Sequence, residues 1–557
     1  MNTLSNKDYL VFLFYFIVVA SYGFWVYHKK KKASISASHD YFLAEGSLTW
    51  WAIGASLIAS NISAEQFIGM SGNGFKMGLA ISTYEWMAAA SLIIVAIFFI
   101  PVYLKNKIYT MPQFLNQRYN GTVAMIMAVF WLLLYVVVNL TSILYLGALA
   151  INGISGINTT ACMYVLAIFA IIITLGGMKV IGYTDVIQVF FLILGGLVTT
   201  YLALNLVSEK FGRTGTLNGF KLMMTHANDH FHMILQKDNA SYSDLPGLAV
   251  LVGGMWIVNL NYWGCNQYIT QRALGADLKT ARSGLLFAAG LKLLMPIIVV
   301  LPGIAAYVLH QQGNFQTEMM QGGEINTDRA YPVLLNLLPA GLKGLAFAAL
   351  TAAVVASLAG KANSISTIFT LDIYKKKIRP DADEKTMVNV GKVAVIVAMI
   401  LAVIIAPLMG IDKKGGFQYI QEYTGFVSPG IFAMFILGFF WKKTTSAAAL
   451  FATVGGFAFS LFFKFLPGFM NLSFLEQSGF SKANSDGIFE IPFIDRMGFV
   501  FVICVAGMVI ISLVENSRGI KTKGLEIDRS MFKMSPGFTV GALIIFGILA
   551  ALYTVLW

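Results

Sequence analysis

The sequence predicts an all-α integral membrane protein with about fourteen transmembrane helices, and three observations support this fold class. Of the 557 residues, 57% are hydrophobic and 12% are charged, and this charged share is about half of that in soluble domains. Runs of about 20 mostly apolar residues, the length that crosses a bilayer core, follow one another along the chain. Two of these runs are interrupted by polar residues at corresponding positions of two five-helix units.

The charged residues indicate how the spans are oriented. The first apolar run is followed by Lys29–Lys32 and has no basic region before it, which predicts an uncleaved helix with its N-terminus outside. An even number of spans puts the C-terminus outside as well, and most of the 39 Lys and Arg then fall in loops assigned inside. We expect a multi-pass protein of the cell's plasma (inner) membrane with both termini extracellular or periplasmic. The spans are expected near 8–27, 50–74, 80–104, 122–150, 158–178, 182–206, 247–270, 284–309, 337–372, 388–409, 419–441, 446–466, 497–515 and 537–557.

The two interrupted runs are the second and the seventh span. The second contains Asn61, Ser63, Glu65 and Gln66, and the seventh contains Asn259, Asn261, Asn266 and Gln267. Four spans separate them, so two blocks of five helices insert with opposite orientation. Broken helices at corresponding positions of inverted repeats indicate a transporter with a binding site near the bilayer midplane. The alternative is that both breaks are kinks that serve packing alone.

This reasoning divides the chain into five segments. An N-terminal extra transmembrane helix and a cytoplasmic basic loop are expected over 1–49, the first five-helix repeat over 50–206, an extracellular loop over 207–246, the inverted second repeat over 247–441 and three C-terminal transmembrane helices over 442–557.

Six polar side chains within the spans are candidates for binding a solute. Such groups are costly in hydrocarbon and usually face a cavity or each other. Amides donate and accept hydrogen bonds, as sugar hydroxyls do, so this set suits a neutral polyol, and pairing of Glu85 with Lys292 would reduce the cost of burying both charges. The alternative for each residue alone is a hydrogen bond between helices. The six are Gln66, Glu85, Asn139, Asn259, Lys292 and Gln421, and aromatic residues near the same levels are Tyr84, Tyr135, Tyr262, Trp263 and Phe417.

Other classes of function are poorly supported. The sequence contains no H-E-x-x-H, nucleophile-elbow or Walker motif, so we expect neither an enzyme nor a pump with its own ATPase. The formal charge of +12 is spread over short loops, which argues against a nucleic-acid partner. The three cysteines lie in apolar runs and have no metal-ligand spacing. His226, His230 and His232 are expected in a solvated loop rather than at a metal ion.

Long stretches of the chain resemble the sodium:solute symporter family in order and over nearly the whole length. The stretches that carry the resemblance are SLIASNISAEQFIGMSGNG (56–74), STYEWM (82–87), FWLLLYVVVNLTSILYLG (130–147), YTDVIQVFF (183–191), NYWGCNQYITQR (261–272), VVLPGIAAYV (299–308), SISTIFTLDIYK (364–375) and FQYIQEYTGFVSPG (417–430).

The resemblance implies a LeuT-like core of five plus five inverted helices and sodium-coupled symport of a neutral hexose such as galactose or glucose by alternating access. The six polar residues named above would then bind the sugar, and sodium is the coupling ion, with no organic cofactor. Tyr262 would stack on the sugar ring as the inner gate with Trp263 beside it, and Met70, Tyr84 and Phe417 would close the site from outside. The implied sodium ligands are the carbonyls of Ala59, Ile62 and Ala353 and the hydroxyl of Ser357.

The chain departs from the family pattern near the implied sodium site. Close relatives carry a serine where this chain has Ala356, so one sodium oxygen is in doubt. Members with a second sodium use a hydroxyl at the position of Ala359 together with the equivalent of Asp185. We therefore predict one sodium per sugar. Ala88, where close relatives have serine near Glu85, is expected to affect sugar preference.

Lys361 is a further departure from the family pattern, because the family usually has an uncharged residue at this position. It follows Ser357 by four residues and so lies on the same helix face. Three explanations are open: Lys361 extends to the cytoplasmic interface, pairs with a carboxylate such as Asp185, or is a tethered cation that weakens sodium dependence. Three alternatives to a sodium/hexose symporter also stay open. They are a symporter of another polyol such as myo-inositol, a cation-independent sugar transporter, and a sugar sensor. The oligomeric state is not predicted.

Overall fold

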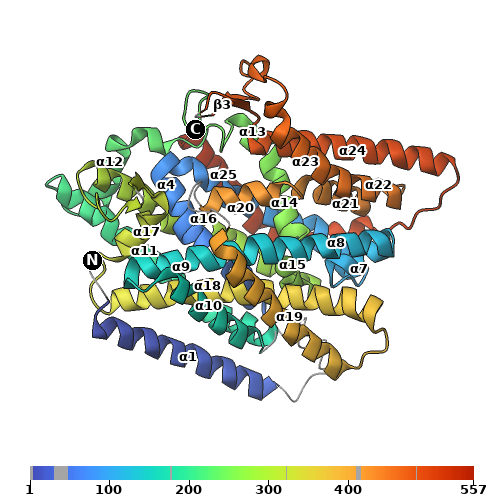
Figure 1. The fold of residues 1–557 in the computed structure, drawn as a ribbon, viewed down its shortest axis with the longest axis horizontal. Coiled ribbons are helices and arrows are strands. Elements are labelled where there is room, and N and C mark those ends of the chain that lie inside the picture. The colour runs from blue at the N-terminus through green and yellow to red at the C-terminus, as the bar shows by residue number, and fades with distance from the viewer. Residues whose placement is uncertain (1–3, 31–47, 176–177, 322, 409–415, 485) are drawn as a thin grey trace.

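The chain forms a mainly helical bundle. The computed structural model describes residues 4–30, 48–175, 178–321, 323–408, 416–484 and 486–557. Figure 1 shows long helices that run side by side across the molecule, with α1 (Asn6–Lys30) along the lower edge and α24 (Phe493–Ser517) at the upper right. The first part of the chain continues with α3 (Trp50–Asn61), η3 (Glu65–Met70), α4 (Ser71–Met77), η4 (Gly78–Ser82), α5 (Thr83–Ile94), η5 (Val95–Phe99), α6 (Ile100–Lys105), α7 (Met111–Arg118), α8 (Gly121–Leu133), η6 (Leu134–Leu140), α9 (Thr141–Ser155), α10 (Thr159–Thr174), α11 (Met178–Lys210), α12 (Thr216–His226) and η7 (Asn228–Phe231).

The second part contains the other helices and two small hairpins. Strands β1 (Met320–Gln321) and β2 (Glu324–Ile325) pair antiparallel, as do β3 (Lys482–Ala483) and β4 (Phe489–Glu490). The helices are α13 (Leu248–Val252), α14 (Gly254–Gly264), α15 (Gln267–Leu274), α16 (Leu278–Gln311), η8 (Thr327–Arg329), α17 (Ala330–Leu335), α18 (Leu342–Thr367), η9 (Ile368–Ile378), α19 (Glu384–Ile405), η10 (Ala406–Leu408), α20 (Gly416–Gly425), α21 (Ser428–Phe440), α22 (Ser446–Leu450), η12 (Phe451–Gly455), α23 (Gly456–Phe465), η13 (Leu466–Gly468), η14 (Ser473–Leu475), η15 (Arg529–Phe532) and α25 (Pro536–Val555).

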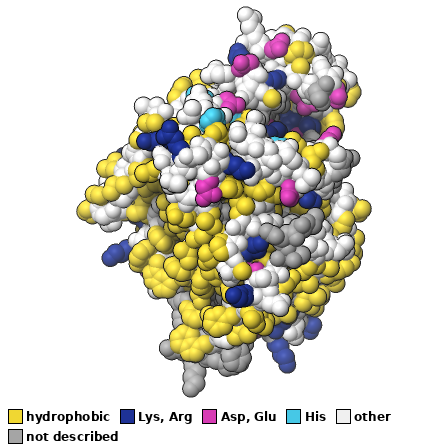
Figure 2. Space-filling model, turned by 90° about the vertical axis from the view of Figure 1, so that its left-hand side faces the viewer, with side chains coloured by type: hydrophobic (Ala, Val, Ile, Leu, Met, Phe, Trp, Pro, Cys, Tyr) yellow, Lys and Arg dark blue, Asp and Glu magenta, His cyan; other side chains and the backbone are white. Residues whose placement is uncertain are grey.

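The surface of the bundle suits a bilayer. Large apolar side chains stand exposed along the outer helices, for example Phe14 of α1, Ile172 of α10 and Ile404 of α19. Figure 2 shows hydrophobic side chains along both margins of one face, whereas acidic side chains gather in its upper half. Soluble monomers rarely expose so many large apolar side chains side by side. The protein is therefore an all-α, multi-pass membrane protein.

The expected number of fourteen spans is not confirmed. Among the described residues, nine helices are long and apolar enough to cross a bilayer, and a tenth is added if the bent pair α20 and α21 is one span. Segments of several other expected spans are helical but short or interrupted: α3 has 12 residues, α10 has 16 and α14 has 11. Length and apolarity alone therefore undercount crossings that are broken.

One of the nine helical stretches is too long for a single crossing. Residues Glu65–Lys105 form 41 continuous helical residues, and at 1.5 Å per residue this is about 60 Å, twice the thickness of the bilayer core. Gly78, between α4 and η4, has a positive φ of 72°, which glycine adopts without strain. Helices α4 and α5, on either side of it, both pack against α16. The chain therefore turns at Gly78, and the stretch belongs to two crossings.

Both predicted helix breaks are confirmed. Helix α3 ends at Asn61, Ile62 has an extended ψ of 104°, and helical structure resumes at Glu65. Helix α14 ends at Gly264, and α15 begins after Asn266, whose backbone is extended. Each break falls among the polar residues of its span, the first near the middle of 50–74 and the second toward the end of 247–270.

The three histidines that precede α13 lie at the end of α12, within η7 and directly after η7, and each has its own structural contacts. His230 is buried, stacks on Tyr307 at 4.0 Å, and donates from Nε2 to the Phe75 carbonyl at 3.1 Å. His226 stacks on Phe211, and His232 hydrogen-bonds the backbone oxygen of Trp557. Among the described residues, no group of three or more His, Cys, Asp or Glu side chains could hold a metal ion.

Candidate functional site

A small polar cavity lies where the two broken helices meet. Residues from both breaks line it together with residues of α5, η6, α16, α18 and α20. Its volume is about 50 Å³, which is room for a few water molecules. All six candidate sugar-binding residues line this cavity: Gln66, Glu85, Asn139, Asn259, Lys292 and Gln421. Helices that are distant in sequence therefore bring together the polar groups that the sequence singled out.

Lys292 and Glu85 form a buried ion pair at the cavity wall. Nζ of Lys292 lies 2.5 Å from Oε2 of Glu85, and both side chains are almost fully buried. The ammonium group also donates to Oδ1 of Asn61 and lies 5.2 Å from the centre of the Trp263 ring. The pairing expected from the sequence is present, and Asn61 extends it to the end of α3.

The amide side chains are held by the local backbone. Oε1 of Gln66 accepts a hydrogen bond from the Ser63 N–H at 3.1 Å, inside the break between α3 and η3. Nδ2 of Asn259 donates to the Met255 carbonyl at 3.1 Å, one turn earlier on α14. Asn139 lies in the π-helical segment η6. Widened helical turns of this type occur often at functional sites.

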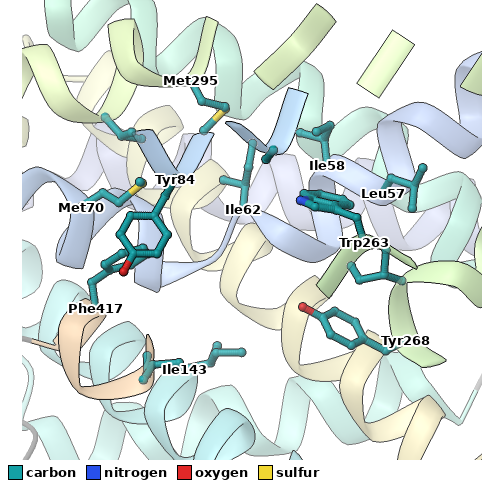
Figure 3. Packing of buried hydrophobic residues seen from close by; sticks show 14 of the residues in the cluster. Leu57, Ile58, Ile62, Met70, Tyr84, Ile143, Trp263, Tyr268, Met295 and Phe417 are labelled. Carbon is teal, nitrogen blue, oxygen red and sulfur yellow. The ribbon is translucent and has the colours of Figure 1, made fainter. Parts of the chain in front are cut away.

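The candidate outer gate is an aromatic contact between α5 and α20. The rings of Tyr84 and Phe417 meet edge to face with centroids 4.9 Å apart, and both side chains are buried. Among the described residues, the Tyr84 hydroxyl has no hydrogen-bond partner. Met70 is buried beside this pair but does not line the cavity. Figure 3 shows Met70, Tyr84 and Phe417 grouped on one side, with Trp263 and Tyr268 on the other.

The candidate inner gate is a chain of hydroxyl and amide contacts. Nδ2 of Asn61 donates to the Tyr262 hydroxyl at 3.0 Å, and this hydroxyl also contacts the hydroxyl of Tyr268. The ring of Tyr262 lies 5.1 Å from that of Trp263 and 5.7 Å from that of Tyr268. These contacts join α14, α15 and the end of α3, so this gate cannot move without changing the first helix break.

The implied sodium ligands lie where α18 packs against the end of α3. The hydroxyl of Ser357 donates to the Ser60 carbonyl at 3.2 Å. In an unbroken helix the Ser63 N–H would donate to the Ala59 carbonyl, but here it donates to Gln66. The break therefore releases the Ala59 carbonyl from its helical partner. Oxygen atoms of this kind suit a hard cation, and Ala59, Ile62, Ala353 and Ser357 are all buried beside this contact.

One expectation for Lys361 is wrong, and the expected pairing with a carboxylate is confirmed, although with a different partner from the example Asp185. It does not extend to an interface, because only 3% of the residue is exposed. It pairs with a carboxylate, but its partner is Glu65, whose Oε1 lies 3.5 Å from Nζ. Asp185 instead accepts a hydrogen bond from Ser56 at 2.6 Å and lies 3.8 Å from the guanidinium of Arg272. The fixed cation beside Asp185 is therefore an arginine.

Several cavity residues were not assigned a role from the sequence. Asn61, Glu65 and Asn266 had been identified only as the residues that interrupt the spans, and Thr424 not at all. Oδ1 of Asn266 accepts a hydrogen bond from Tyr135, which links the second break to η6. The polar interruption of an apolar run was the signal available for the three at the breaks.

Comparison with known proteins identifies the family. A profile of the sodium:solute symporter family matches residues 41–456, which is most of the chain. The chain belongs to this family. The symporter is 46% identical to the sodium/glucose cotransporter of Vibrio parahaemolyticus, over all of this chain and 99% of that protein. It is 34% identical to the human sodium/myo-inositol cotransporter 2, over 82% of this chain and 70% of that protein.

The fold comparison agrees with this assignment. The structure of a Na⁺-coupled sialic acid symporter in an outward-open state matches with a TM-score of 0.74 at 22% identity, over 94% of this chain and all of the other. The symporter therefore has the LeuT-like inverted-repeat fold that its sequence predicts, with a break in the first helix of each repeat. Its family function is sodium-coupled transport of a solute, and it is not an enzyme.

Proposed function

We propose that this symporter couples the entry of Na⁺ to the uptake of a neutral hexose, galactose or glucose, with one sodium per sugar. The main observation in support is the cavity that gathers six amide side chains, including the four proposed to bind sugar, and two neutralised ion pairs from separate helices. Pairing removes net charge, and amides serve both as donors and as acceptors for hydroxyl groups. The sodium/glucose cotransporter of Vibrio parahaemolyticus, with 46% identity over the whole chain, supports a hexose.

The size of the cavity requires that its gates move during transport. About 50 Å³ holds only a few waters, so a hexose fits only when part of the lining withdraws. Parting of the Tyr84–Phe417 contact would open one route, and parting of the Tyr262–Tyr268 contact would open the other. Alternating access follows if the two contacts part in turn.

Sodium would couple to the sugar through the first helix break. The carbonyls of Ala59, Ile62 and Ala353 and the hydroxyl of Ser357 are our proposed ligands, so the ion would hold α3 against α18. Asn61, between two of these ligands, contacts both Lys292 and the Tyr262 hydroxyl. An ion that orders this break therefore favours sugar binding, and by linkage the sugar favours the ion equally.

The stoichiometry of one rests on the surroundings of Asp185. A second sodium there would need a hydroxyl at position 359, which is alanine. The guanidinium of Arg272 lies 3.8 Å from the Asp185 carboxylate, and Arg272 Nε and this carboxylate both contact the Ser56 hydroxyl. A fixed cation at this position disfavours a second, mobile one.

The first test is uptake by the purified full-length protein in proteoliposomes. We expect labelled galactose to accumulate under an inward Na⁺ gradient and not under an equal K⁺ gradient. Unlabelled glucose should compete with labelled galactose for uptake. Unlabelled myo-inositol is the second competitor, because one relative is a sodium/myo-inositol cotransporter, and it distinguishes a hexose transporter from an inositol transporter. Equal uptake in both cations would reject sodium coupling. Sodium-driven uptake of myo-inositol without galactose uptake would reject the hexose and keep the coupling.

We also propose a plasma-membrane location with both termini on the outer face. A single cysteine introduced near either terminus should react with a membrane-impermeant maleimide in intact cells. Labelling only after permeabilisation would reverse the assignment.

A further inference from the structure

A buried lysine on α18 faces the first helix break. Lys361 and Glu65 are 3% and 8% exposed, and their charged groups lie 3.5 Å apart. Burying two charges is costly unless they stabilise one another, so this pair is a defined feature and not a surface contact. Glu65 is the first residue of η3, directly after the break, so the pair joins α18 to the half of the helix that follows it.

The same ammonium group also reaches the candidate inner gate. Nζ of Lys361 lies 5.1 Å from the centre of the Tyr268 ring, within the range of a cation–π contact. The Tyr268 hydroxyl contacts that of Tyr262, to which Asn61 donates at 3.0 Å. Lys361 and Glu65 both line the polar cavity. A change in the charge of Lys361 or Glu65 therefore alters the electrostatic surroundings of the inner gate as well as those of the helix break.

The two charged residues follow candidate sodium ligands closely in sequence, one on each helix. Lys361 follows Ser357 by four residues on α18, which places the two side chains on one face about 6 Å apart at Cβ. Glu65 follows Ile62 by three residues across the break. In a site shielded from water, charges at such distances act strongly on a bound cation. The ammonium disfavours the ion and the carboxylate favours it.

We propose that the Lys361–Glu65 pair sets the sodium affinity of this symporter, with the lysine lowering the affinity and the glutamate raising it. The proposal rests on the sodium site of the proposed function. The pair also forms a tie between α18 and η3 that exists without the ion. Bound sodium would therefore add to a contact that the Lys361–Glu65 pair already makes. After the ion leaves, this pair would still join α18 to η3.

A purely structural pair makes a different prediction. If Lys361 and Glu65 only held the helices together, then removing either charge would loosen the site and weaken sodium binding in both variants. Electrostatic control instead predicts effects of opposite sign. The direction of the two changes, rather than their size, separates the two roles.

The experiment measures Na⁺ binding to purified full-length protein by tryptophan fluorescence, with choline keeping the ionic strength constant. We expect Lys361→Met to lower the half-saturating Na⁺ concentration by about threefold or more, and Glu65→Gln to raise it by about threefold or more, because each leaves one uncompensated charge near the ion. The double variant should return to within about twofold of the wild type, since both charges are then absent.

A matched control lies further along the same helical stretch. Lys376 and Asp372 form an i,i+4 pair at 2.6 Å on η9, far along the chain from Ser357. Lys376→Gln and Asp372→Asn should leave the half-saturating Na⁺ concentration unchanged. Shifts of the same sign in Lys361→Met and Glu65→Gln, or no shift in either, would overturn the proposal. The charge-swapped variant Lys361→Glu with Glu65→Lys keeps the pair if a single variant fails to fold, and its affinity should be within about threefold of the wild type.

Failure of this inference differs from failure of the proposed function. If wild-type vesicles accumulate galactose with Na⁺ but the variants bind Na⁺ alike, only the inference is wrong. If the wild type does not transport galactose, but Lys361→Met and Glu65→Gln shift the half-saturating Na⁺ concentration in opposite directions, the hexose assignment is wrong and the inference stands. If the wild type gives no response to Na⁺ in either assay, both the sodium site and the inference built on it are rejected.

Discussion

At the scale of the residue, Lys292 shows how a charge is accommodated inside this symporter. Its ammonium group contacts a carboxylate on α5 and an amide at the end of α3, and it lies over the Trp263 ring. A charge buried without partners would be several kcal/mol more costly. Because the lysine and the glutamate neutralise each other, the cavity offers hydrogen bonds without net charge. This property is the basis of our proposal that the solute is uncharged rather than an acid or an amine.

Neutralising Glu85 tests this arrangement. We expect Glu85→Gln to lower labelled galactose uptake by about tenfold or more, because it replaces one carboxylate oxygen by an N–H donor and leaves the buried Lys292 without its counter-charge, beside Asn61 and the Trp263 ring. Gln421→Ala should have a similar effect on uptake without altering the ion pair. The measurement is initial uptake rate against galactose concentration in proteoliposomes with equal protein content. Wild-type kinetics in both variants would remove these two residues from the site.

At the scale of the element, two glycines with a positive φ differ in ψ and in surroundings: ψ is −147° at Gly78 and 1° at Gly156. Gly78, at the turn between α4 and η4, has a φ of 72°, and an added Cβ would lie 2.3 Å from the His230 carbonyl oxygen. Gly156, after α9, has a φ of 73°, and an added Cβ would meet nothing within 4 Å. Both substitutions strain the backbone, but only the first also forces a loop away from the turn.

Gly156→Ala therefore tests left-handed backbone strain alone, whereas Gly78→Ala combines a backbone conformation that essentially only glycine adopts with a steric contact. We expect Gly156→Ala to cost about 1 kcal/mol of stability from its left-handed conformation. Gly78→Ala should cost more, about 2–5 kcal/mol, because a contact with backbone cannot be relieved by a rotamer change. The unfolding midpoint of each purified variant is measured in detergent and compared with that of the wild type, which shows which substitution lowers stability more. A smaller decrease for Gly78→Ala than for Gly156→Ala would show that the loop carrying His230 moves freely.

At the scale of the whole molecule, ion binding is expected to stabilise the fold, because the proposed ligands belong to two separate helices. The end of α3 meets the interior of α18 at the hydrogen bond from Ser357 to the Ser60 carbonyl. A ligand that binds only the folded protein adds stability in proportion to the logarithm of its concentration.

Sodium should therefore raise the unfolding temperature in a saturable way, and potassium should not. At a Na⁺ concentration of 100 times Kd the added stability is about 2.7 kcal/mol. Ser357→Ala should lower the unfolding temperature in choline slightly, because it removes the hydrogen bond to Ser60, and should in addition move the stabilising response to higher Na⁺ concentrations. If sodium and potassium stabilise the protein equally, the effect comes from ionic strength and not from a site.

Much of this structure could be predicted from the order of residue types. The bilayer forces apolar runs of a set length, and unpaired backbone groups are tolerated within it only beside a cavity or another helix. The breaks after Asn61 and after Gly264 were therefore visible as polar clusters, and so were the six polar residues that now line one cavity. The assignment of particular residues to sugar or sodium stays a prediction.

The choice of partners was decided by the tertiary structure. From the sequence, Asp185 was the example given of a carboxylate partner for Lys361, but the structure pairs Lys361 with Glu65 and brings Asp185 to Arg272. The sequence by itself determined that this is an inverted-repeat membrane transporter, because hydropathy and the helical repeat act locally along the chain. Which charge faces which depends on the rotation and depth of helices far apart in sequence, and these are set only when the helices pack.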